Sequence, residues 1–313
     1  MLKRCLVWML LSGASAVFAQ DYPNKPIRIV TSEAGGGNDV QARLVAQGLA
    51  SALGEQVIVE NRPSGVIPGE VVSKAAPNGY TLLLYNNTLW IGPLLQNTPY
   101  DMARDFAPIT SVTRAPNVLV VNSTLPVKSV AELVALAKAK PGELNYGSSG
   151  TGGSNHLAAE LFRFMAGVNI VRINYKGAGP ALTALLAGEL QLMFPTAGAV
   201  TPHFKAGRVR ALAVTSAEPT ALFPGVPTVA AVLPGYESIS IYGIFAPAKT
   251  PRTIIDKLNQ EIVRFLNRTE VKEKFFIAGM EAVGSSPEQF AATVKSEMAR
   301  MGKVIKEAGI RTE

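Results

Sequence analysis

Short runs of apolar and β-branched residues alternate with longer amphipathic stretches along the chain. The run IRIVTS at residues 27–32 is followed by VQARLVAQGLASAL at 40–53, where apolar residues recur every three or four positions. Runs rich in Val, Ile and Thr are typical of strands, and the longer period is typical of helices. The alternation predicts an α/β fold with a parallel sheet covered by helices. The expected strands are residues 26–32, 55–61, 80–86, 118–121, 143–149, 169–175, 190–196, 208–216 and 237–247.

Capping signals mark several of the expected helix starts. Ser129 is followed three residues later by Glu132, which is the pattern of a capping box. Pro251 follows a threonine and Pro287 follows a serine, and proline suits the first turn of a helix. The expected helices are residues 39–53, 69–76, 129–140, 154–166, 180–188, 198–206, 251–267 and 287–308.

The order of these elements predicts two α/β units. We expect a first domain of residues 20–121 plus 246–313 and a second domain of residues 122–245. No long Gly/Ser or Pro linker separates them, so we expect extended crossings near 121–125 and 237–245. Two crossings of this kind would form a hinge.

The first twenty residues, MLKRCLVWMLLSGASAVFAQ, have the features of a secretory signal peptide. Lys3 and Arg4 precede an apolar run, and small residues precede an expected cleavage after Ala19. Removing 19 of the 313 residues leaves 294, takes away the only cysteine, Cys5, and lowers the net charge from +7 to +5. We therefore expect a periplasmic protein held together by its core and not by disulfides.

The remaining positive charge is spread along the chain without a basic run, which argues against a nucleic-acid partner. The mature chain has two histidines, His156 and His203, and no cysteine, so we expect neither a zinc site nor another cofactor. A serine hydrolase is also disfavoured. Ser149 lies in GSSG, but Thr151 stands where the last glycine of GxSxG belongs, and His156 is badly placed as its base.

Two glycine-rich turns precede expected helices: EAGGGND at residues 33–39 and YGSSGTGGSNH at 146–156. A helix start leaves backbone N–H groups unpaired and carries a partial positive charge, so it can hold an anion. Glycine lets the anion approach the backbone closely. The two turns are either tight turns only or two halves of a carboxylate clamp, one in each unit. Polar residues at other strand ends, Asn86, Asn87, Lys176 and Thr196, add candidates, because ligands of open α/β sheets gather there.

A series of sequence blocks extends over essentially the whole mature chain: YPNKPIRIV, AGGGND, LGEQVIVENRP, NGYTLLL, PYDMARDFAPI, LNYGSSGTGGSNHLAAELF, INYKGAGPAL, RALAVTS, PGVPTV and GIFAPAKTP. Together they resemble the periplasmic receptors of tripartite tricarboxylate transporters, the Bug-type solute-binding proteins. The resemblance implies a two-domain type II periplasmic-binding-protein fold with a hinge and an interdomain ligand cleft. It also implies a receptor that captures a small organic anion and delivers it to membrane transporter subunits.

The resemblance further implies that the two glycine turns hold opposite carboxylates through backbone N–H groups and hydroxyls. Asp39 is equally suited to capping its own helix. The candidate ligand-binding residues are Ser32, Glu33, Ala34, Gly35, Gly36, Asn38, Asp39, Asn87, Ser148, Ser149, Gly150, Thr151, Gly152, Ser154, His156, Lys176 and Thr196.

The sequence departs from the family pattern at three places that bear on the ligand. Thr31-Ser32-Glu33 replaces the usual proline and aromatic residue, and an inward Glu33 would repel a dianion. NRPSGVIPG replaces a more flexible glycine segment, and Pro195 stands where relatives often carry an acidic residue. A plain carboxylate or an aromatic acid is therefore expected more than an amino-dicarboxylate. We expect a monomer, and an extracytoplasmic ligand sensor for a signalling protein remains the alternative to a transport receptor.

Overall fold

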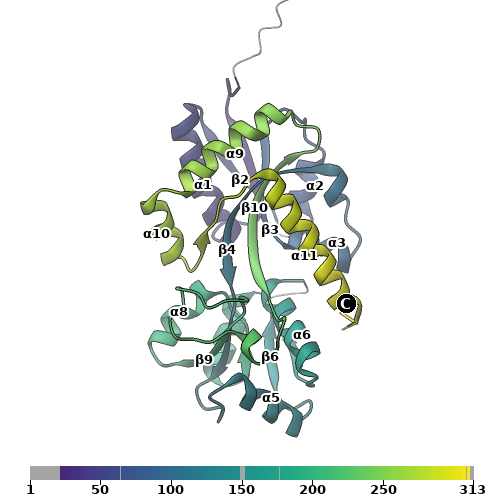
Figure 1. Cartoon of the computed structure of the whole chain (residues 1–313), viewed down its shortest axis with the longest axis vertical. Helices are drawn as coiled ribbons and strands as arrows, with labels where there is room; N and C mark the ends of the chain where they lie inside the picture. Colours follow the sequence, from purple (N-terminus) through teal and green to yellow (C-terminus); the bar gives the residue numbers. More distant parts are fainter. Residues whose placement is uncertain (1–21, 64, 149–151, 176, 308, 311–313) are drawn as a thin grey trace, which may run out of the picture.

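The computed structural model describes residues 22–63, 65–148, 152–175, 177–307 and 309–310. These residues form two β-sheets, and Figure 1 shows the two units built on them one above the other. The first unit contains a six-stranded sheet with strand order β11-β4-β10-β3-β1-β2. The second contains a five-stranded sheet with order β7-β6-β8-β5-β9.

The sheet of the first unit is mixed, which corrects the expectation of a parallel sheet. β1 is parallel to β2 and β3, whereas β10 is antiparallel to both β3 and β4. The strands are β1 (Ile27–Thr31), β2 (Val57–Asn61), β3 (Thr81–Asn86), β4 (Phe106–Pro116), β10 (Ile239–Pro247) and β11 (Glu281–Ala282).

The second sheet also combines parallel and antiparallel strands. β6 is parallel to β7 and β8, and β5 is antiparallel to β8 and β9. The strands are β5 (Val118–Asn122), β6 (Asn145–Ser148), β7 (Val171–Asn174), β8 (Leu192–Met193) and β9 (Val209–Val214).

Most helices begin close to the residues that the sequence indicates. Ser129 Oγ accepts a hydrogen bond from the Glu132 N–H, which is the expected cap, while the Glu132 carboxylate accepts from the Lys128 N–H, one residue before the N-cap. The helices are α1 (Gly37–Leu53), α2 (Ile67–Ser73), α3 (Thr88–Leu95), α4 (Met102–Asp105), α5 (Val130–Ala139), α6 (Ser154–Ala166), α7 (Ala178–Ala187), α8 (Ala197–Lys205), α9 (Arg252–Leu266), α10 (Thr269–Ile277) and α11 (Pro287–Glu307), with a 3₁₀ turn η1 at Val229–Ala231.

Helices cover both faces of the first sheet. Buried residues of α1, α9 and α10 form one apolar cluster on one face. Residues of α2, α3 and α11 pack on the other face, in a cluster that continues into α5 and α6 of the second unit. The core therefore extends across the junction of the units on that side.

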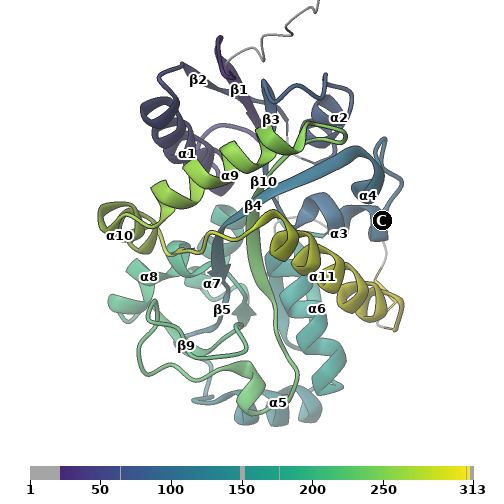
Figure 2. The ribbon, with the colours of Figure 1, turned by 45° about the horizontal axis from the view of Figure 1, so that its top comes forward.

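The chain changes sheet at Asn117, between β4 and β5, and again just before β10 (Figure 2). The expected boundary after residue 121 falls inside β5, and that after residue 245 falls inside β10. Sheet membership thus puts the crossings at Asn117 and near Ser238. None of the helices in the described ranges has the length and apolar composition that a bilayer crossing requires.

The carboxyl ends of the parallel strands point from both sheets to this junction. In the first sheet, Asn86 at the end of β3 pairs with Tyr242, near the start of β10. In the second, Thr196, just after β8, forms a bridge with Asn117 at the crossing, and β6 runs parallel to β8. The helices that follow β1, β3, β6 and β8 therefore begin at the junction.

Candidate functional site

The first glycine turn closes through a bond from its backbone to its own helix. Gly35 has a φ of 82°, in the left-handed region that favours glycine, and its N–H donates to Asp39 Oδ2 at 2.9 Å. Gly36 is the N-cap of α1, and the helix ladder begins with the bond from the Val40 N–H to the Gly36 carbonyl. The N–H groups of the first three helical residues have no partner within the helix.

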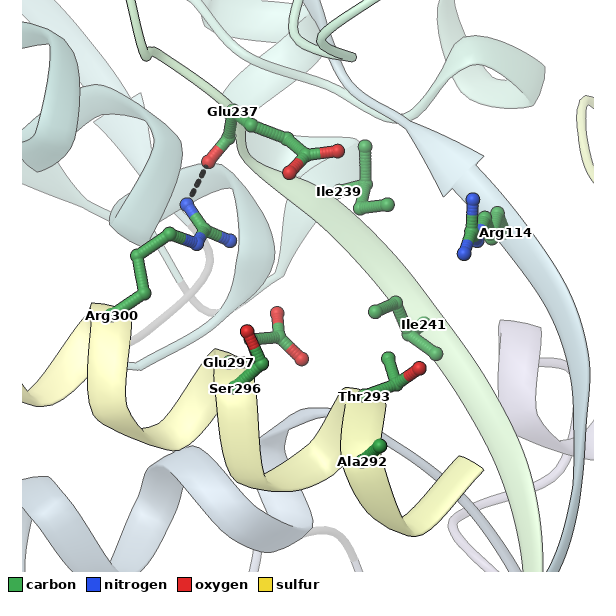
Figure 3. A pocket seen from close by; sticks show the side chains of 9 residues that line it. All are labelled: Arg114, Glu237, Ile239, Ile241, Ala292, Thr293, Ser296, Glu297 and Arg300. Atoms are coloured by element: carbon green, nitrogen blue, oxygen red, sulfur yellow. Dashed lines mark hydrogen bonds between the residues drawn. The ribbon is translucent and has the colours of Figure 1, made fainter. Parts of the chain in front are cut away.

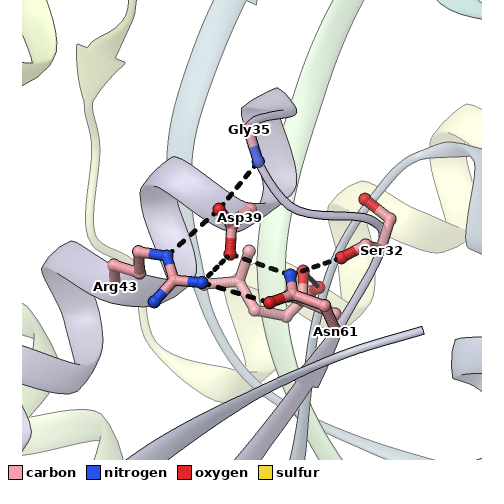
Figure 4. Close-up of polar contacts among 7 residues, drawn as sticks. Ser32, Gly35, Asp39, Arg43 and Asn61 are labelled. Atoms are coloured by element: carbon pink, nitrogen blue, oxygen red, sulfur yellow. Dashed lines mark hydrogen bonds and ion pairs between the residues drawn. The ribbon is translucent and has the colours of Figure 1, made fainter.

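Most of the polar contacts of this turn are made by the Asp39 carboxylate, as Figure 4 shows. Its carboxylate also accepts hydrogen bonds from Asn61 Nδ2 at 2.8 Å and Arg43 Nε at 3.1 Å. Burial alone would raise the pKa of Asp39, but the bonds from Arg43, Gly35 and Asn61 hold that pKa below its usual value. The geometry therefore supports the capping role considered for Asp39. Sequence reasoning missed Asn61, which is the last residue of β2 and the first of the NRP segment.

Ser32 and Asn38 complete the buried side of the turn. The Ser32 carbonyl accepts from Asn61 Nδ2 at 2.7 Å, and its hydroxyl accepts from Asn38 Nδ2 at 3.1 Å. Asn38 Oδ1 is buried and has no hydrogen-bond partner among the described residues. Glu33, Ala34 and Gly35 are exposed. Ser32 is thus a support for Asn38 rather than an open pocket wall.

The second glycine turn repeats this construction. Gly152 has a φ of 80°, and its N–H donates to His156 Nδ1 at 3.1 Å. Gly153 is the N-cap of α6 and Ser154 its first residue. In both turns a left-handed glycine precedes the N-cap and bonds to the side chain of the third helical residue, with asparagine as the second. The two sequences are Gly35-Gly36-Gly37-Asn38-Asp39 and Gly152-Gly153-Ser154-Asn155-His156.

His156 is a neutral acceptor in this arrangement. It is 3% exposed, and burial, aided by the positive charge of Arg172, lowers its pKa to about 4. Because Nδ1 accepts the Gly152 N–H, the ring proton is assigned to Nε2. The candidates Ser149, Gly150, Thr151 and Lys176 lie outside the described residues.

An arginine that sequence reasoning missed lies beside the second turn. Arg172, on β7, donates from Nε to the hydroxyl of the buried Ser148 at 2.8 Å. Pairing of β6 with β7 places the two residues on adjacent strands. Only the fold brings Arg172 to the turn, since it stands 24 residues from Ser148 in the chain. It adds a full positive charge to this half-site.

Asn87 has a different role from the one expected. Its Nδ2 donates to the Ile239 carbonyl at 3.1 Å and to Glu297 Oε1 at 2.9 Å, so the side chain faces β10 and α11. Figure 3 shows Glu297 and Arg300 on α11 beside β10, with Arg300 bonded to the Glu237 carbonyl. The amide of Asn87 is therefore occupied within the protein.

Asn86 instead lies on the side of α1. It pairs with Tyr242, and a methyl group built on Gly37 would lie 2.9 Å from the Tyr242 hydroxyl oxygen. Burial raises the pKa of Tyr242 to about 12, so its hydroxyl stays protonated as a donor. Thr196 has the N-cap position of α8 but makes no side-chain capping bond.

The second turn also reaches the first unit. A methyl group built on Gly152 would lie 2.9 Å from Leu95 Cδ1, at the end of α3. The starts of α1 and α6 thus both lie at the junction. In the first turn of α6 the His156 N–H already donates to Asn155 Oδ1 at 2.8 Å. In the described part of the chain, no group of three or more His, Cys, Asp or Glu side chains is arranged to hold a metal ion.

Residues 41–310 match the model of the tripartite tricarboxylate transporter family receptor. The chain belongs to this family. Protein BugT of Bordetella pertussis is 36% identical over 305 residues, which cover 95% of this chain and 94% of BugT.

Two solved structures from Rhodopseudomonas palustris are similar throughout. Rpa4515, solved with adipate, is 36% identical, with a TM-score of 0.84 over 94% of this chain and 100% of its own. MatC, solved with bound malate, is 27% identical, with a TM-score of 0.78 over 91% of this chain and 100% of its own. These findings confirm the resemblance and the two-sheet periplasmic-binding-protein fold. The receptor is a solute-binding protein of a periplasmic family and not an enzyme, which removes the serine hydrolase alternative.

Proposed function

We propose that this receptor captures a small carboxylate between its two units and delivers it to membrane transporter subunits. The observation that carries the proposal is the repeated construction of the α1 and α6 starts. Each has an N-terminal glycine folded back onto the third helical residue, and each lies at the junction. A dicarboxylate held by one helix start at each end would bridge the units.

The physical basis is the charge of the helix ends. The Gly35 and Gly152 N–H groups are used inside the turns, and the His156 N–H donates to the Asn155 side chain. The donors proposed for the ligand are therefore the amides of Gly37 and Ser154, the first residues of the two helices. Each helix start contributes on the order of 0.3–1 kcal/mol to anion binding, and up to about 2 kcal/mol in a partly buried site. Exclusion of water as the units close would strengthen every such bond.

The charges of the two half-sites favour an anion without an amine. Arg172 lies beside the second turn, where its guanidinium donates to the Ser148 hydroxyl, and Arg43 pairs with Asp39 in the first. Pro195 is buried and offers no carboxylate to a ligand amine. The adipate and malate of the two solved relatives support a dicarboxylate as the ligand class.

A thermal-shift screen of residues 20–313 tests the ligand class. Mono-, di- and tricarboxylates, aromatic acids, amino acids and neutral amides would be compared, because a ligand of the folded state raises the melting temperature with concentration. We expect dicarboxylates to give the largest shifts. Shifts from amines or amides alone would refute the carboxylate assignment.

The Gly152→Asp variant tests the location of the site. It places a negative charge in the second turn, so we expect adipate binding measured by calorimetry to be lost. Gly167→Asp is the matched control: Gly167 ends α6, has a φ of 61°, and a methyl group there meets nothing within 4 Å. Both variants carry similar backbone strain, so equal affinities would contradict the proposed site.

Delivery and location need separate tests. Cleavage after Ala19 predicts a periplasmic chain whose intact mass corresponds to residues 20–313, and light scattering should give the mass of a monomer. Crosslinking in the periplasm with and without ligand should capture a transporter subunit with the liganded form. Capture of a signalling protein instead would assign the sensor role.

A further inference from the structure

Two glycines from different units are in contact at the junction. Gly198 is the second residue of α8 in the second unit, and Gly279 lies between α10 and β11 in the first. A methyl group built on Gly198 would lie 2.3 Å from the Ala278 carbonyl oxygen, and one on Gly279 would lie 2.1 Å from the Gly198 nitrogen. Real Cβ atoms do not approach backbone this closely, so the contact requires glycine on both sides.

The contact joins the ends of two helices. Ala278 is the C-cap of α10, and its carbonyl lies against the first turn of α8. The negative end of one helix thus meets the positive end of another, which is a favourable pairing. Figures 1 and 2 both show α10 beside α8.

A side-chain bond reinforces the same region. The Thr220 hydroxyl, from the segment after β9, donates to Glu281 on β11. Glu281 pairs with Arg114 on β4, three residues before the crossing at Asn117. The contact between units therefore lies next to the covalent crossings and on the side of α10.

We propose that Gly198 and Gly279 form a further noncovalent connection between the units, which fixes the axis of closure and so the spacing of the two half-sites. The two crossings and the apolar cluster on the side of α3 and α11 hold the units together elsewhere. The glycine contact adds a fixed point on the side of α10, which resists twisting of one unit against the other. The effect on ligand binding rests on the proposed function, whereas the connection itself does not.

A side chain at Gly198 should loosen this connection without unfolding either unit. The atoms that a new side chain would meet are the carbonyl carbon and oxygen of Ala278. These backbone atoms cannot move aside as the end of a flexible side chain does. The two units must separate instead, and fewer molecules hold the half-sites at the binding distance. If the competent fraction falls from about one half to about one twentieth, the apparent Kd rises about tenfold.

The test compares Gly198→Ala with Gly302→Ala. Gly302 is a helical glycine of α11 whose added methyl would make only an ordinary contact, 3.9 Å from Leu94 Cδ1. Spin labels on Gln47→Cys and Lys138→Cys, exposed positions on α1 and α5, report the distance between units by pulsed electron paramagnetic resonance. Mature protein, residues 20–313, is suited to this because Cys5 is the only native cysteine.

We expect a broader distance distribution in ligand-free Gly198→Ala, about tenfold weaker adipate binding, and no fall in melting temperature. Gly302→Ala should change neither distance nor affinity. Thr220→Val, which removes the second contact and adds no bulk, should broaden the distribution to a smaller extent. Unchanged distributions in both junction variants would overturn the connection. A broadened distribution in a protein that binds no carboxylate would retain the connection and refute the proposed function.

Discussion

Replacing Ser154 with aspartate would separate the stability of the second half-site from its affinity for an anion. Ser154 is the first residue of α6 and is half-buried. Gly153 holds the N-cap position, so the Ser154 hydroxyl does not cap the helix. Its backbone is helical, so the substitution brings no conformational strain. The new carboxylate would lie at the positive end of the helix, where we place one end of the ligand.

The two effects have opposite signs. A carboxylate in the first turn of a helix stabilises it by about 0.3–1 kcal/mol. A second carboxylate about 5 Å away would be repelled by roughly 3 kcal/mol at an effective dielectric constant of about 20, which is about a hundredfold in Kd. Ser154→Asp should therefore unfold at an equal or higher urea concentration and yet bind the carboxylate selected by the thermal-shift screen about a hundred times more weakly.

The control is Thr269→Asp. Thr269 is also the first residue of its helix, α10, but it is exposed and lies away from the junction. Urea unfolding and calorimetry on both variants give the two quantities independently. An unchanged affinity for that carboxylate in Ser154→Asp, with its stability preserved, would refute the idea that the start of α6 holds the anion.

Three further variants test the polar contacts around the site. Asp39→Asn should cost about 1–3 kcal/mol at pH 7 in urea unfolding, because the Gly35 N–H and the arginine lose a charged acceptor. Hydrogen bonds hold the pKa of Asp39 below its usual value, so wild type should lose this stability as the pH falls through that lowered pKa, and the variant should not. His156→Asn keeps an acceptor but removes the titrating ring. Since the pKa of His156 is lowered to about 4, wild type should lose roughly 3 kcal/mol more stability than the variant between pH 6.5 and 4. Glu297→Gln should destabilise by about 1–3 kcal/mol, because one oxygen must then serve both Asn87 and Trp90.

The elements with local signals were predicted well from the sequence. The capping box at Ser129 predicted the start of α5, and the periodic run after the first turn predicted α1. The glycine turns were found because a helix start, its preceding strand and its glycines are contiguous in the chain. Sequence reasoning is reliable where all the interacting atoms lie within a few residues of one another.

The elements that depend on distant partners were missed. β4 has the sequence FAPITSVTRAP, whose Pro108 and Pro116 argue against a strand in a sheet interior. It forms because β10 pairs along it from Ile239 to Pro247, with two shifts of register that accommodate irregular pairing. The bond from Arg172 to Ser148 and that from Asn87 to Glu297 likewise join residues that only the tertiary fold brings together.

The candidate residues fall into two groups: those whose side chains close the glycine turns and those whose backbone amides are proposed to bind the ligand. The sequence alone did not separate these groups. A polar side chain just inside a helix start is close enough to close the turn that precedes it, and both Asp39 and His156 do this. One is an anion and the other a neutral ring, so their shared role is to accept a glycine N–H and not to supply charge to a ligand. What remains for the ligand is the backbone amides that neither side chain uses. Charged and titratable side chains in this protein therefore mark the residues that build the two half-sites. The atoms proposed to bind the carboxylate are backbone amides of small residues, Gly37 and Ser154.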